Sequence, residues 1–64
     1  MKFPPPPDIE PLLTTDETAV VCKVNEKTVI RWIKAGDLPA IRLGRQYRIR
    51  RRDLELFLRE RWIG

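Results

Sequence analysis

Histidine is absent from the 64-residue sequence, and Cys22 is its only cysteine. A zinc site built from cysteine and histidine is therefore excluded, and so is an internal disulfide. A serine or cysteine nucleophile would also lack the histidine that usually acts as its base. A lone cysteine at a helical position is usually a small buried hydrophobe. We therefore expect no enzymatic activity, no metal and no cofactor.

The sequence also lacks a long apolar run and a signal-peptide pattern. Both absences predict a cytoplasmic protein without a membrane partner. A chain of 64 residues forms one small domain at most, close to the lower size limit for folding on a single core. A content of 42% hydrophobic and 34% charged residues is typical of a soluble globular domain.

Acidic residues are missing between Arg42 and Arg52, a stretch that holds six arginines. Residues 23–64 contain twelve cations and five acids, a formal charge of +7, whereas residues 1–22 contain one cation and four acids. A charge run is often only a solvated surface. Here the clustering and the use of arginine favour a polyanion partner, and nucleic acid in particular.

Prolines are concentrated at the beginning of the chain, at positions 4–7 and 11. This composition predicts an extended, disordered arm over residues 1–12, to which we assign no function. The folded domain is expected to span residues 13–64.

Two short helices follow the arm. Thr14 and Glu17 have the spacing of a capping box, which predicts a helix from there to about Lys23 with Ala19 and Cys22 facing inward. Asn25 suits the N-cap of the next helix, and Gly36 suits the left-handed residue that follows its end. Two helices joined so closely indicate a helix-turn-helix.

The second helix has two faces. Val29, Trp32 and Ile33 recur at helical spacing and are predicted to pack in the core. Lys27, Thr28 and Arg31 fall together on the opposite side, where donors could enter a nucleic-acid groove.

A hairpin and a last helix complete the pattern. Residues 40–43 and 47–50 alternate like strands around a turn at 44–46, so their apolar side chains are expected to face the helices and their arginines to face outward or lie at the tip. Asp53 falls in the first turn of a helix whose Leu54, Phe57 and Leu58 have core spacing, with no Ser, Thr or Asn as its cap. Trp62 and Ile63 either fold back onto the core or form a patch for a partner, and we expect packing.

This order of elements strongly resembles the excisionase-family DNA-binding domain, a compact winged helix-turn-helix related to the DNA-binding part of mercury-resistance-type regulators. The matching positions are Leu13, Thr14, Glu17, Ala19, Val24, Asn25, Thr28, Val29, Arg31, Trp32, 36–39, 42–45, 47–49, Asp53, Leu54, Phe57 and Leu58. Two positions depart from the family. Lys23 replaces a frequent glycine in the turn between the helices, so this turn is expected either to differ from that of the family or to carry local strain. Arg50 replaces proline or another neutral residue.

The resemblance implies a mainly α fold with a small β-hairpin, namely three short helices plus a two-stranded wing. It further implies double-stranded DNA as the partner, with the second helix in the major groove and the wing in the adjacent minor groove. Excisionases bind near attachment sites, bend the DNA and direct an integrase towards excision of a mobile element. The protein is accordingly expected to be nucleoid-associated and a monomer in solution that binds DNA cooperatively.

Five residues of the second helix are candidate DNA contacts. Arg31 suits a bidentate contact with guanine, and Lys27, four residues earlier, suits a base or a phosphate. Thr28 suits a phosphate, a thymine methyl group or the cap of its own helix. Asn25 is a better cap than base contact, and Lys34 reaches phosphate at most.

The wing supplies the other candidates. Arg45 follows Gly44 and suits insertion into a narrow minor groove, while Arg42, Gln46 and Arg48 flank it. Further along the chain, Arg50, Arg51 and Arg52 either contact the flanking backbone or are solvated.

Two other functions stay open. A small transcriptional regulator would use the same fold and the same contacts as an excisionase. A protein-interaction module would instead use Trp62, Ile63 and the basic surface on an acidic partner. RNA binding is less favoured, because exposed aromatic residues for base stacking are scarce.

Overall fold

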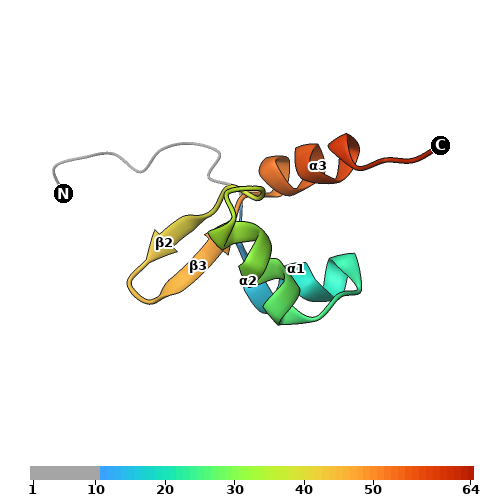
Figure 1. Cartoon of the computed structure of the whole chain (residues 1–64). Helices are drawn as coiled ribbons and strands as arrows, with labels where there is room; N and C mark the ends of the chain where they lie inside the picture. The colour runs from blue at the N-terminus through green and yellow to red at the C-terminus, as the bar shows by residue number, and fades with distance from the viewer. Residues whose placement is uncertain (1–10) are drawn as a thin grey trace, which may run out of the picture.

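The computed structural model describes residues 11–64, so the predicted proline-rich arm lies outside the described residues except for Pro11 and Leu12. Along the chain the elements are β1 (Leu13–Thr14), α1 (Thr15–Cys22), α2 (Glu26–Lys34), β2 (Ile41–Leu43), β3 (Gln46–Ile49) and α3 (Arg51–Glu60). Strands β2 and β3 form a hairpin that projects from the helices (Figure 1). The prediction of a mainly α winged helix-turn-helix is confirmed. Within residues 11–64, every helix is too short or too polar to span a bilayer.

The beginning of α1 has the predicted capping box. The Glu17 amide donates to Thr14 Oγ1 at 3.0 Å, and the Thr14 amide donates to Glu17 Oε1 at 2.9 Å. The helix ends at Lys23, whose φ of 56° is left-handed. A side chain with a Cβ is strained in this conformation. The predicted strain at the position where the family often has glycine is therefore present in the backbone.

Helix α2 begins and ends as the sequence predicts. The Asn25 side chain accepts a hydrogen bond from the Lys27 amide at 2.9 Å, which identifies it as the N-cap. Gly36 is left-handed with a φ of 82°, and its amide donates to the Ile33 carbonyl at 3.0 Å.

The wing belongs to a sheet of three strands, whereas two were predicted. The order is β1-β3-β2, all antiparallel, and Leu13 pairs with Ile49. Two residues are too few for an alternating pattern, so β1 could not be predicted from the sequence. Because β1 leads directly into α1, the sheet fixes the wing to the first helix of the helix-turn-helix.

The core lies where the three helices meet the sheet. Its buried apolar residues come from every major part of the fold: Ala19, Val29, Leu38, Ile49, Leu54 and Phe57. Trp32 and Ile33 pack against this cluster, and the Trp32 ring lies 4.8 Å from the Phe57 ring between centroids. The predicted inward positions of α1 and α2 are therefore confirmed.

One face prediction for the wing is wrong. Ile41 and Leu43 were expected to face the helices, yet they are 37% and 52% exposed. The register places Arg42 opposite Tyr47, which lies on the same face of β3 as the buried Ile49. Ile41 and Leu43 therefore point to the other face, which no helix covers.

Two predictions for the end of the chain are also wrong. Leu58 is 41% exposed, because Leu54 and Phe57 already occupy the side of α3 that meets the core. Trp62 and Ile63 are 79% and 95% exposed and do not fold back onto it. The Phe57 ring is instead covered by Arg61, whose guanidinium carbon lies 3.7 Å from the ring centroid.

Candidate nucleic-acid interface

The outer face of α2 is cationic. Lys27, Arg31 and Lys34 are exposed, and helical spacing puts them opposite the buried Val29. None of the three side chains forms a hydrogen bond or ion pair with another part of residues 11–64. The core contact of Val29 thus orients α2 and leaves three charges available to a ligand.

Three polar side chains at the start of α2 are less accessible to a ligand than these three cations, because each is half-buried or hydrogen-bonded within the fold. The Asn25 amide oxygen is engaged as the cap, and Thr28 is half-buried. Glu26 accepts a hydrogen bond from Thr15 Oγ1 at 2.7 Å, which holds the carboxylate towards α1. The acid therefore connects the two helices at the edge of the cationic face.

The tip of the wing exposes one arginine with few constraints. Gly44 has a φ of 65°, which allows the tight turn, and Arg45 follows it as an exposed residue. Arg42 is held more firmly, because its Nε donates to the Gly44 carbonyl at 3.1 Å. Arg48 donates to Gln46 Oε1 at 2.7 Å and to the Tyr47 carbonyl at 2.9 Å. The wing thus presents two positioned guanidinium groups beside a tip arginine.

An open groove lies between α2 and the wing. Its lining residues come from the end of β1, the start of α1, α2, and β3 with its preceding turn: Thr14, Thr15, Asp16, Glu26, Ile30, Arg45, Gln46, Tyr47 and Arg48. The groove shows that the Glu26–Ile30 edge of α2 and β3 with its preceding turn border the same space. Sequence reasoning did not assign Ile30 or Tyr47 to the interface, because neither side chain is charged.

The groove is not lined by Arg50, Arg51 or Arg52. Arg50 forms a two-point ion pair with Asp53, with Nε to Oδ2 at 2.7 Å and Nη2 to Oδ1 at 3.1 Å. This pair stabilises the start of α3, which has no side-chain cap. Arg51 and Arg52 are exposed.

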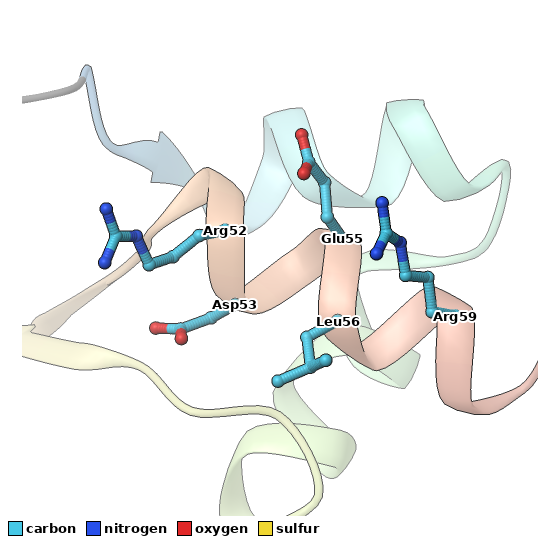
Figure 2. Close-up of a pocket in the computed structure, with 5 residues that line it drawn as sticks. All are labelled: Arg52, Asp53, Glu55, Leu56 and Arg59. Atoms are coloured by element: carbon cyan, nitrogen blue, oxygen red, sulfur yellow. The ribbon is translucent and has the colours of Figure 1, made fainter.

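The outer face of α3 has mixed charge. Figure 2 shows Glu55 and Arg59 projecting on one side of the helix and Leu56 on the other, with Arg52 near its start. Alternating charges interspersed with an apolar residue are poorly suited to a phosphate backbone. The cationic face of α2 and the wing are therefore the better nucleic-acid surface.

Cys22 has no features of a reactive site. The side chain is half-buried, and burial raises the pKa of its thiol, which favours the neutral form. Residues 11–64 contain no cluster of cysteine and acidic side chains that could hold a metal ion.

Comparison with known proteins agrees with this geometry. Two strains of Mycobacterium tuberculosis, CDC 1551 / Oshkosh and H37Rv, each have a relative named "Putative DNA-binding protein". Each is 45% identical over 38 residues, which cover 59% of this chain and 49% of the relative. The chain thus spans about half the length of the curated relatives that it matches. No solved structure gives a significant match. A family model described as a helix-turn-helix domain matches residues 12–61, and the chain belongs to this helix-turn-helix family of DNA-binding domains.

Proposed function

We propose that the protein is a sequence-specific double-stranded DNA-binding protein of excisionase type. The observation that supports this most directly is the convergence of two cationic surfaces beside one groove. The first is the exposed Lys27–Arg31–Lys34 face of α2, which adjoins the Glu26–Ile30 edge that lines the groove. The second is the wing with Arg45 at its tip. This two-point arrangement suits a helix in the major groove and a wing in the adjacent minor groove, with a phosphate backbone between them.

Helix α2 supplies the base contacts in this proposal. Arg31 lies in the middle of the exposed face, where a guanidinium can bind the O6 and N7 atoms of guanine. Lys27 lies one turn earlier and contacts a base or phosphate. Lys34 is near the end of the helix and contacts phosphate. Thr28, which is half-buried, has at most a peripheral contact, and Asn25 acts through its cap.

The wing supplies much of the affinity. Arg45 enters the minor groove, where negative potential is strongest in narrow A·T stretches. Arg42 and Arg48 hold flanking phosphates from positions that their own hydrogen bonds fix, and Gln46 positions Arg48. With roughly four to six phosphates neutralised, affinity is expected to fall steeply with salt. Arg51 and Arg52 contribute at most to the flanking backbone.

The biological role in this proposal is excision of a mobile element together with an integrase. The alternative, a small transcriptional regulator, would make the same DNA contacts. A neighbouring integrase gene would favour excision, and its absence would favour regulation. The exposed Trp62 and Ile63 provide apolar surface for a protein partner in either case.

Selection from randomised duplex DNA tests the proposal, followed by affinity measurements on the selected site and on random duplex. Arg31→Ala is expected to weaken binding to the selected site by roughly tenfold or more and binding to random duplex far less. Arg59→Ala, on the outer face of α3, is the matched control and should change neither. Equal losses on both duplexes would contradict a base contact by Arg31, and failure to enrich any site would contradict sequence-specific binding.

A further inference from the structure

The exposed face of the wing contains aliphatic residues where a purely electrostatic DNA contact would need only cations. All three residues of β2 are exposed, and Leu43 is 52% exposed directly beside the turn. Alternation and register put Ile41, Leu43, Gln46 and Arg48 on this one face. Ile41 and Leu43 are not among the residues that form the core or pack against it.

Leu43 is the aliphatic residue of this face that lies nearest the tip of the wing. It immediately precedes the turn of Gly44 and Arg45, and it is the direct cross-strand partner of Gln46. Gln46 lines the groove together with Arg45 and Arg48. A duplex that takes up Arg45 at the tip would therefore meet Leu43 beside it.

The walls of the DNA minor groove are chemically mixed in a way that fits this surface. Deoxyribose C–H groups form an apolar lining, and phosphates form the outer rim. An aliphatic side chain flanked by guanidinium groups can contact both. Apolar side chains of proteins that bind the minor groove are also used as wedges that open or bend it.

We propose that Leu43 is a DNA-contacting residue that packs against the deoxyribose wall of the minor groove next to Arg45. This inference rests on the proposed function, because it assigns a contact within the same complex. Its ligand is the sugar edge of double-stranded DNA. The contact is apolar, so it adds affinity and groove deformation without releasing counterions.

Leu43→Ala provides the test, measured by affinity on the selected duplex over a range of salt concentrations. Affinity is expected to fall roughly fivefold to tenfold while the dependence of log K on log salt keeps the wild-type slope, because no charge is lost. Arg45→Ala should instead lower the slope magnitude by about one. Leu43→Met should retain most of the affinity, since an apolar side chain of similar volume remains.

The matched control is Leu56→Ala, which removes a leucine side chain of similar exposure, 59%, on the outer face of α3. It should leave DNA affinity unchanged. Thermal unfolding of each variant checks the fold. Hydroxyl-radical footprinting gives a second measurement, because the radical attacks deoxyribose from the minor groove, and Leu43→Ala should lose protection only at the position of the wing.

The outcomes separate the two proposals. If wild type binds the selected duplex but Leu43→Ala binds and protects it equally well, the Leu43 contact is wrong and the proposed function stands. If Leu43→Ala changes the salt slope as well as the affinity, the substitution displaces the arginines and the direct contact is wrong. If wild type binds no duplex, the proposed function fails and the Leu43 contact fails with it.

Discussion

Helix α2 and the wing present cations to the same side of the molecule, but they are held in place by different means. Helix α2 is anchored by its own side chains, with Val29 fully buried and Trp32 against Phe57. Apart from Ile49, the strands of the wing have no buried side chain, and they are held by backbone pairing between β2, β3 and β1. A substitution in the core can therefore displace α2. The wing should tolerate side-chain changes that keep its backbone hydrogen bonds and the turn at Gly44.

The difference in anchoring between α2 and the wing suits their proposed roles on DNA. A base-contacting helix must keep its register in the major groove to within a fraction of an ångström, and core packing provides that rigidity. A wing that follows a phosphate backbone needs less precision, and an exposed hairpin on one glycine turn suits that role.

Val29→Ala is expected to destabilise the protein by about 2 kcal/mol, because it removes two buried methyl groups and leaves a cavity. Ile41→Ala on the wing is the counterpart and should cost about 0.5 kcal/mol. Urea denaturation followed by circular dichroism measures both. Equal losses would show that the wing is as tightly packed as α2, which would contradict the contrast.

Lys23→Gly is expected to stabilise the protein by about 1 kcal/mol, because glycine relieves the left-handed strain in the turn between α1 and α2. The same exchange at Lys34, within α2, should instead cost about 0.5–1 kcal/mol through lost helix propensity. Thermal unfolding of the two variants gives opposite signs if the strain at Lys23 is real. A destabilised Lys23→Gly variant would refute it.

Asn25→Ala is expected to cost about 1 kcal/mol by removing the cap of α2, and Asn25→Ser, a neutral N-cap, should restore most of it. The pair also separates capping from DNA contact. If Asn25 acts only as a cap, Asn25→Ser binds DNA nearly as well as wild type. A large loss of affinity with normal stability would instead place Asn25 against the DNA.

Arg50→Ala is expected to cost about 0.5 kcal/mol, since its ion pair with Asp53 is partly exposed and therefore screened. The loss should shrink in 1 M salt. Arg52→Ala, two residues further along and without an ion pair among residues 11–64, should have no measurable effect on stability. Equal effects of the two substitutions on stability would show that the ion pair between Arg50 and Asp53 does not stabilise the start of α3.

Local chemistry explains why the helix ends could be predicted from the sequence. The capping box at Thr14 and Glu17, the cap at Asn25 and the left-handed Gly36 each depend on residues within a few positions. The cationic face of α2 followed from helical spacing alone. Such features do not depend on contacts with residues that are distant in the sequence.

The inward and outward faces of the wing, in contrast, depend on residues that are distant in the sequence. Ile41 and Leu43 alternate with Arg42, and the same spacing fits either face of a sheet. Only pairing with β3, whose Ile49 reaches the core, decides which face is inward, and the apolar pair proved to be outward. The two-residue β1 and the exposed Trp62 likewise depend on long-range pairing and on core surface already covered by Arg61.

The unequal burial of the two tryptophans gives the protein a built-in optical probe. Trp32 is partly buried against Phe57, whereas Trp62 is 79% exposed beyond the end of α3. An aqueous collisional quencher should therefore reach the fluorescence of Trp62 well before that of Trp32. In a Trp62→Phe variant the remaining emission would come from the contact between α2 and α3, so a single wavelength would follow the joining of these helices during folding.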